Sequence, residues 1–123
     1  MNGTIIVVDD SPTVVKFVSL SLKKLGHDIV TATDGMDALE KMSHLTDVVC
    51  LVITDLNMPN LDGYGFIETL RENPNYKDTP IIILSSEEGS DEREKGLSAG
   101  ASSYLVKPFN PAILLQEVSQ YIK

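Results

Sequence analysis

Short apolar runs alternate with more polar segments along the chain, and four of these runs have the length of a β-strand. They cover residues 4–8, 49–54, 80–84 and 102–106, and they are nearly continuous in apolar side chains. Such runs are typical of parallel strands that helices cover on both faces. Residues 28–33 form a fifth, more polar stretch, which suits a strand at the edge of a sheet. The pattern therefore predicts five strands.

The segments between the predicted strands have the period of amphipathic helices. Their apolar positions are Val14, Val18, Leu22 and Leu25 in the first, Ala38, Leu39 and Met42 in the second, Phe66, Ile67 and Leu70 in the third, and Leu114, Val118, Tyr121 and Ile122 in the last. Ser11 and Pro12 are typical of an N-cap and a first helical residue, and Gly26 of a helix end. Residues 88–100 are expected to form a weakly packed fourth helix, because they are polar and include two glycines.

Five alternations of strand and helix predict an α/β fold, a doubly wound sheet of five parallel strands flanked by five helices. The chain has 123 residues, which corresponds to one domain covering residues 1–123. Because the chain ends directly after its last predicted helix, we expect no second domain. No apolar run is long enough to cross a bilayer, and we expect a cytoplasmic protein without membrane contact.

Charge and cysteine usage narrow the possible functions. The formal net charge is −8, which disfavours direct binding to nucleic-acid backbones and to anionic lipid. Cys50 is the single cysteine, so an internal disulfide and a cysteine-based zinc site are excluded. Its apolar surroundings in the sequence indicate a small buried hydrophobic residue.

Polar residues gather at the ends of four predicted strands, on the edge of the sheet where doubly wound folds bind ligands. They are Asp9 and Asp10 after the first strand, Asp55 after the third, Ser85 and Ser86 at the end of the fourth, and Lys107 and Pro108 after the fifth. Taken singly, each of them also has a structural interpretation as a cap, a turn residue or a solvated side chain. Their convergence on one edge is what predicts a functional site.

Three carboxylates on this edge create a charge problem. Two like unit charges 4 Å apart repel by roughly 4 kcal/mol at an effective dielectric constant near 20, so either a carboxylate is protonated or a cation binds. Mg²⁺ together with Lys107 balances Asp9, Asp10 and Asp55, and a small set of oxygen ligands favours Mg²⁺ over zinc or calcium. A carboxylate nucleophile, a metal and cationic donors are typical of phosphoryl transfer to an aspartate.

Sequence motifs surround these residues. They are Asp9-Asp10, Asp55-Leu56-Asn57-Met58-Pro59, Asp62-Gly63, Ser85 and Tyr104-Leu105-Val106-Lys107-Pro108-Phe109. Their combination resembles the response-regulator receiver family over essentially the whole chain. The resemblance implies the strand order 2-1-3-4-5. It also implies a two-component switch that accepts a phosphoryl group from the phosphohistidine of a separate histidine kinase.

The resemblance further implies which residues hold the phosphoryl group and the metal. Asp55 is expected to be the phosphoacceptor. Asp10, Asp55 and the backbone carbonyl of Asn57 are expected to bind Mg²⁺, with Asp9 acting mainly through metal-bound water. Lys107 is expected to pair with the phosphoryl group.

Other positions match the switching residues of the family. Ser85 is expected to close on the phosphoryl oxygen and Tyr104 to change rotamer with it, which alters the face made by the fourth helix, fifth strand and fifth helix. The family more often has Thr at position 85, and Ser keeps the hydroxyl. Asn57 and Glu87 are expected to tune the rate of self-dephosphorylation.

Partners and oligomeric state follow from the same resemblance. A downstream effector is expected on the switching face, and the chain is expected to be a monomer or a phosphorylation-dependent homodimer, a signalling switch rather than an enzyme. Ile113, Glu117 and Gln120 share an apolar and acidic face of the last helix, whereas relatives that bind the flagellar motor carry lysines there. This favours another effector or a receiver dimer. A stand-alone chemotaxis or phosphorelay regulator is favoured over a receiver that belongs to a larger regulator.

Three alternatives compete with this interpretation. A flavodoxin-like flavin carrier shares the fold, but Asp9-Asp10 would repel its phosphate. A dehalogenase-type phosphatase needs a second acid two residues after the first, and here Asp9 is followed by Asp10 and Ser11. A receiver-like binding module that is never phosphorylated would not need the complete residue set. His27 and His44 are interpreted as residues near helix ends that interact with the backbone dipole, not as phosphohistidines.

Overall fold

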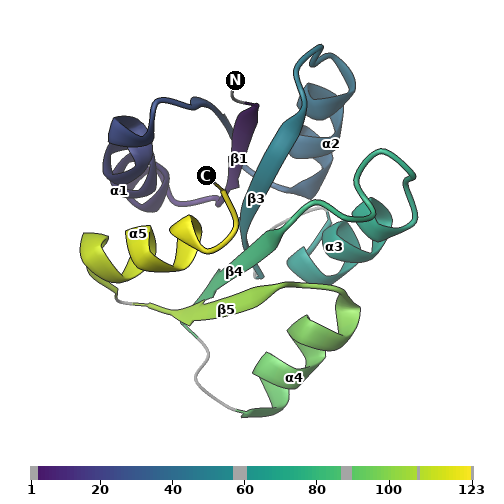
Figure 1. Cartoon of the computed structure of the whole chain (residues 1–123). Helices are drawn as coiled ribbons and strands as arrows, with labels where there is room; N and C mark the ends of the chain where they lie inside the picture. Colours follow the sequence, from purple (N-terminus) through teal and green to yellow (C-terminus); the bar gives the residue numbers. More distant parts are fainter. Residues whose placement is uncertain (1–2, 57–60, 87–89, 108, 123) are drawn as a thin grey trace.

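The computed structural model describes residues 3–56, 61–86, 90–107 and 109–122. Within these residues the strands and helices alternate as the sequence predicts (Figure 1). The elements are β1 (Thr4–Val8), α1 (Pro12–Leu22), the 3₁₀ turn η1 (Lys23–Leu25), β2 (Asp28–Ala32), α2 (Gly35–Ser43), β3 (Val49–Asp55), α3 (Gly63–Arg71), β4 (Ile81–Ser85), α4 (Ser90–Ala99), β5 (Ser103–Val106) and α5 (Pro111–Ser119).

The five strands form one parallel sheet in the order β2-β1-β3-β4-β5, so the predicted order 2-1-3-4-5 is confirmed. β2 lies at an edge, as its polar sequence indicates. Asp55 is the last residue of β3 and pairs with Leu84, and Ser85 pairs with Val106. This register brings the carboxyl ends of the central strands level with one another.

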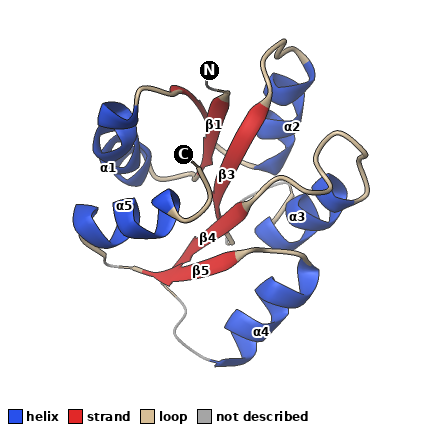
Figure 2. Ribbon diagram, viewed as in Figure 1, coloured by secondary structure: helices blue, strands red, loops and turns tan. Residues whose placement is uncertain are grey.

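Helices cover both faces of the sheet (Figure 2). The alternation of side chains along β1 separates two apolar cores. Ile5 and Val7 pack in the core beneath α1 and α5, and Ile6 and Val8 pack in the core beneath α2, α3 and α4. Because both cores are apolar, the strands read as nearly continuous hydrophobic runs.

Polar side chains begin most of the helices. Ser11 caps α1 and Asp62 caps α3, and Pro12 opens α1, as predicted. Asp34 also accepts a hydrogen bond from the Asp37 N–H and caps α2, although the Asp34-Gly35 sequence is equally compatible with a turn. These caps satisfy backbone donors at the helix ends that face the carboxyl edge of the sheet.

Helix α4 has little apolar surface of its own, as the sequence predicts, and it approaches the sheet through a glycine. Its single large apolar side chain, Leu97, is exposed, but Gly96 is buried against the sheet. A Cβ at Gly96 would lie 2.6 Å from Ile83 Cδ1, so the absence of a side chain lets the helix approach closely. Polar contacts add to this approach, because the Tyr64 hydroxyl lies 3.2 Å from Glu92 Oε2. Burial and the hydrogen bond to Glu92 raise the pKa of Tyr64 to about 12.

Cys50 is only half-buried, so the expectation of a fully buried hydrophobic residue is wrong. Its Sγ lies 3.7 Å from Nδ1 of His27, and the same nitrogen lies 3.3 Å from the carbonyl oxygen of Gly3. Burial raises the pKa of the Cys50 thiol. His27 therefore joins the amino ends of β1 and β3.

None of the helices in the described part of the chain is long and apolar enough to cross a membrane.

Candidate functional site

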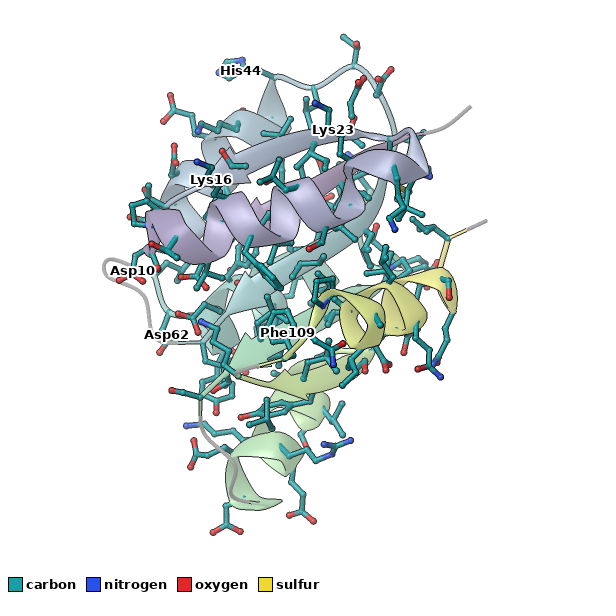
Figure 3. The ribbon with its side chains drawn as sticks, turned by 90° about the vertical axis from the view of Figure 1, so that its left-hand side faces the viewer. Asp10, Lys16, Lys23, His44, Asp62 and Phe109 are labelled. Atoms are coloured by element: carbon teal, nitrogen blue, oxygen red, sulfur yellow. The ribbon has the colours of Figure 1, made fainter. Side chains whose placement is uncertain are left out.

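The polar residues predicted at the strand ends meet at one edge of the sheet. Asp9 follows β1, Asp55 ends β3, Ser85 ends β4 and Lys107 follows β5. Figure 3 shows Asp10, which precedes α1, and Asp62, the cap of α3, at the same end of the molecule. The register of the parallel strands is what brings these side chains together.

Asp9 is fixed through both of its carboxylate oxygens. Its backbone N–H donates to the Ala32 carbonyl, which continues the ladder between β1 and β2. The Ser11 N–H donates to Oδ1 at 2.9 Å, and the Lys107 ammonium donates to Oδ2 at 3.0 Å. Only 2% of Asp9 is exposed, so the ion pair with Lys107 is largely shielded from water. Charge-assisted bonds of this kind offset part of the cost of burying the carboxylate.

Asp55 lies at the centre of the site and is 7% exposed. Its Oδ1 accepts a hydrogen bond from the Leu56 N–H at 2.8 Å and lies 3.6 Å from Lys107 Nζ. Helix α3 begins directly against this residue, since a Cβ at Gly63 would lie 2.5 Å from the Asp55 carbonyl oxygen. Gly63 therefore allows the helix to start where a larger residue would displace Asp55.

The carboxylates of Asp9, Asp10 and Asp55 form a compact acidic cluster. Each contributes one oxygen, and these oxygens all lie within 4.8 Å of one another. Asp10 is exposed, and a cleft of about 220 Å³ between α1 and β2 opens onto Asp9 and Asp10. Hard oxygen donors at this spacing, with one side open to solvent, fit a divalent cation such as Mg²⁺.

The electrostatics of the cluster act most strongly on Asp55. Its burial raises the pKa of this carboxyl above the usual range, and the negative charge of Asp9 raises it further. The Lys107 ammonium and the Leu56 N–H lower this pKa, while Asp10 adds a smaller rise. The net shift of this pKa is upward, and burial is its largest cause.

The predicted switching residues lie next to the cluster. The Lys107 N–H donates to the Ser85 carbonyl at 2.7 Å, which ties the loop after β5 to the end of β4. Ser85 is fully buried and Tyr104 is 4% exposed, in the core beneath α4. The guanidinium of Arg93 lies 5.9 Å from the centre of the Tyr104 ring. Ser85 and Lys107 thus border the phosphoacceptor candidate, and Tyr104 lies under α4.

Some of the residues that the sequence singled out lie outside the described part of the chain, and one aromatic contact near the site was not predicted. Asn57, Glu87 and Pro108 lie outside the described residues. An edge-to-face contact that the sequence did not predict joins Phe17 of α1 to Phe109, and the two ring centres are 5.6 Å apart. Phe109 belongs to the motif that contains Lys107, and this was the signal that could have drawn attention to it.

Comparisons with known proteins agree with this geometry. The sequence model of the family described as response regulator receiver domain matches residues 5–119 of this chain. This chain belongs to the response regulator receiver domain family. It is therefore a signalling domain of two-component response regulators, and domains of this kind interact with histidine kinases and with downstream effectors. Receiver domains bind Mg²⁺ at an acidic site.

Individual relatives resemble this receiver domain over nearly its whole length. Protein PilG of Pseudomonas aeruginosa is 38% identical over 118 residues, which cover 96% of this chain and 86% of the relative. The chemotaxis response regulator CheY4 of Vibrio cholerae has a TM-score of 0.91 at 34% identity, covering 99% of this chain and 100% of that chain. The receiver domain of the sensor histidine kinase PA1611 from P. aeruginosa was solved with a magnesium ion coordinated in its active site cleft, with a TM-score of 0.86, 28% identity and 98% coverage of each chain.

Removing the charge of Asp55 is expected to stabilise the metal-free receiver domain at neutral pH. The raised pKa means that the folded state binds a proton at Asp55 more readily than the unfolded state does. Its contribution to stability is therefore present below the unfolded pKa and is lost as the pH rises through the folded value. Asp55→Asn should raise the melting temperature at pH 7 by roughly 3–6 °C, and this gain should shrink towards pH 4.

The measurement is thermal unfolding with a chelator present, at pH 4 and at pH 7. Asp47→Asn removes an equal charge from an exposed position before β3, at the other end of that strand from Asp55, and serves as the control. A gain for Asp55→Asn that is no larger than that of the control, or that grows towards pH 4, would contradict the electrostatic interpretation.

Proposed function

We propose that Asp55 accepts a phosphoryl group from the phosphohistidine of a histidine kinase and that the phosphorylated state binds a downstream effector. The observation that carries the proposal is the cluster of three carboxylates with the Lys107 ammonium, 3.6 Å from Asp55 Oδ1. Formation of an acyl phosphate requires these two groups, a buried carboxylate nucleophile and a cation that stabilises the phosphoryl oxygens. Sequence resemblance adds the same assignment residue by residue.

In the transfer, a carboxylate oxygen of Asp55 attacks phosphorus, an O–P bond forms and the N–P bond of phosphohistidine breaks. The electron pair of the broken bond stays on the imidazole nitrogen of the donor. Among the described residues, both the Leu56 N–H and Lys107 Nζ contact Oδ1, which favours Oδ2 as the attacking oxygen. Lys107 then stabilises the negative charge of the transferred group.

Asp10, Asp55 and the Asn57 carbonyl would hold Mg²⁺, with Asp9 acting mainly through water. The acidic cluster supports this assignment, and the magnesium ion of the PA1611 receiver domain is a precedent in a relative. When bound, the metal would neutralise carboxylate charge and polarise the phosphoryl oxygens. Asp9 is already engaged by Ser11 and Lys107, which fits an indirect role for it.

The effector surface comprises α4, β5 and α5. Closure of Ser85 and Lys107 on the phosphoryl group would change the rotamer of Tyr104. This would shift a pre-existing equilibrium between two conformations of the surface, one of which the effector binds more tightly. On α5, Ile113 is 46% exposed. The Ser103 hydroxyl donates a hydrogen bond to the Glu117 carboxylate at 2.5 Å. Glu117 therefore connects α5 to β5, in addition to lying on the helix face that it was predicted to share with Ile113.

We also propose a cellular setting, which membership of the receiver family supports. The chain is a cytoplasmic signalling switch rather than an enzyme with an external substrate, and it works as a monomer or a phosphorylation-dependent homodimer without direct nucleic-acid or membrane binding. Residues 1–123 form one receiver domain. The nearly complete coverage of PilG and of the V. cholerae regulator supports a stand-alone regulator of the chemotaxis or phosphorelay type.

Phosphoramidate is expected to add one phosphoryl group to the protein in the presence of Mg²⁺. Intact-mass spectrometry should show one added phosphoryl mass, which disappears in Asp55→Asn and falls strongly in Asp10→Ala, because the second variant loses a proposed metal ligand. Asp62→Asn keeps a capping side chain outside the acidic cluster and should label like the parent. Full labelling of Asp55→Asn would place the phosphoacceptor elsewhere.

Asn57 and Glu87 are expected to set the lifetime of the phosphorylated state. Each follows a residue of the site by two positions in the sequence, so each is proposed to lie where attacking water enters. The decay of the phosphorylated form is measured after removal of phosphoramidate in Asn57→Ala and Glu87→Ala. Both rates should differ from that of the parent by more than twofold, and two unchanged rates would reject this role.

Beryllofluoride, a stable phosphoryl mimic, is expected to change amide chemical shifts beyond the site. The shifts should extend to Tyr104 and to α4, since Gly96 packs against the same part of the sheet as Tyr104. Asp55→Asn recorded under identical conditions controls for non-specific binding. Changes that stay within the loops around Asp55, with Tyr104 and α4 silent, would reject this effector surface.

A further inference from the structure

We infer that Phe17 is a positioning residue for the phosphotransfer, because it supports Lys107 through Phe109. This inference rests on the proposed function and concerns how the lysine is held. Lys107 Nζ bonds to Asp9 Oδ2 at 3.0 Å and lies 3.6 Å from Asp55 Oδ1. A lysine has a long, flexible stem, so its ammonium stays at these distances only if the surrounding loop is fixed.

The loop after β5 is held on two sides. On one side, the Lys107 N–H donates to the Ser85 carbonyl at 2.7 Å. On the other, the Phe109 ring meets Phe17 of α1 with an interplanar angle of 64°, an edge-to-face geometry. Aromatic pairs in this geometry attract each other beyond their burial of area. In Figure 3, Phe109 lies alongside α1 and near the start of α5.

An apolar hollow explains why the aromatic pair is needed. A cavity of about 230 Å³ lies between α1 and the loop after β5, and it is lined by Thr13, Val14, Phe17, Lys107 and Phe109. The stem of Lys107 therefore borders open space on this side instead of a filled core. Beside this space, the contact between the two rings joins the loop to α1, and both rings also pack against the core beneath α1 and α5.

Helix α1 thereby holds both members of one ion pair. At its start, the Ser11 N–H fixes Asp9 Oδ1 at 2.9 Å. Further along, Phe17 supports the loop that carries Lys107. The carboxylate and the ammonium keep their distance because they are attached to the same rigid element. Loss of Phe17 should release the ammonium while the carboxylates stay in place.

The test measures the rate constant of labelling by phosphoramidate, by intact mass, together with the affinity for Mg²⁺ in the same variants. Phe17→Ala is expected to slow labelling about tenfold, less than the roughly 10²-fold that a 1 Å misplacement of a reacting group can cost. Phe17→Leu keeps an apolar side chain and should lose about threefold. Mg²⁺ affinity should stay the same or increase, because Lys107 competes with the metal for Asp9.

Matched variants separate positioning from general loosening of the fold. Leu20→Ala alters the next turn of α1 at an exposed residue that does not line the hollow beside Lys107, and its labelling rate should stay within twofold of the parent. Phe109→Ala should match Phe17→Ala. The double variant should be no slower than either single variant, because both changes remove the same contact.

Each outcome decides the inference. A Phe17→Ala rate within twofold of the parent, additive losses in the double variant, or a parallel loss of Mg²⁺ affinity would each overturn it. If the alanine variants do not fold, Phe17→Leu and Phe109→Leu are judged by the same criteria. A parent protein that is not labelled at all rejects the proposed function and this inference together, whereas a labelled parent with an unaffected Phe17 variant rejects only the inference.

Discussion

Crowding of negative charge at one end of the sheet is the constraint on which the rest of the structure depends. Asp9 and Asp55 are buried there beside Asp10, and the Lys107 ammonium pairs with Asp9 and lies near Asp55. Unpaired buried carboxylates are costly, so the fold supplies N–H donors from Ser11 and Leu56. These contacts reduce the cost without removing the excess of negative charge. The excess that remains is of the kind that favours a bound cation.

Close approach of the helices to the sheet depends on two glycines. Gly63 lets α3 begin against the backbone of Asp55, and Gly96 lets α4 pack on Ile83. At Gly63 and at Gly96 the helix backbone therefore lies directly against the sheet, with no side chain of the helix between them. At the opposite end of the sheet, before β4 and β5 begin, the Arg71 guanidinium adds a polar connection by donating to the carbonyls of Gly100, Tyr76 and Thr79. Close backbone approach at these two glycines thus adds to the apolar packing of α3 and α4 on the sheet.

Much of the fold was predictable because its signals are local. The apolar runs gave the strands to within one residue at each end, and the residues after them gave the acidic cluster with Lys107. Strand order came from family resemblance, since periodicity alone does not determine which strands pair. Asp55 proved to be the last strand residue rather than the first loop residue, a difference within the usual variation of element ends.

Contacts between distant segments were not predictable. The Phe17–Phe109 pair joins two elements that no local pattern relates, and Gly96 looked like a helix-weakening residue because its tight neighbour, Ile83, belongs to another element. The capping role of Asp34 was not predictable either, because an Asp-Gly pair is also typical of turns. Each of these features depends on which surfaces meet after folding.

The half-buried thiol of Cys50 gives this protein a built-in attachment point. Cys50 lies near the amino end of β3, and Asp55 lies at the other end of the same strand, roughly 16 Å away at the usual rise per residue. It is the single cysteine of the sequence, so a spin label or fluorophore would react at one position without any engineered residue. Because burial raises the pKa of this thiol, coupling will be slow at neutral pH and faster in mildly alkaline buffer. A probe on Cys50 would report on the sheet from the end opposite the acidic cluster.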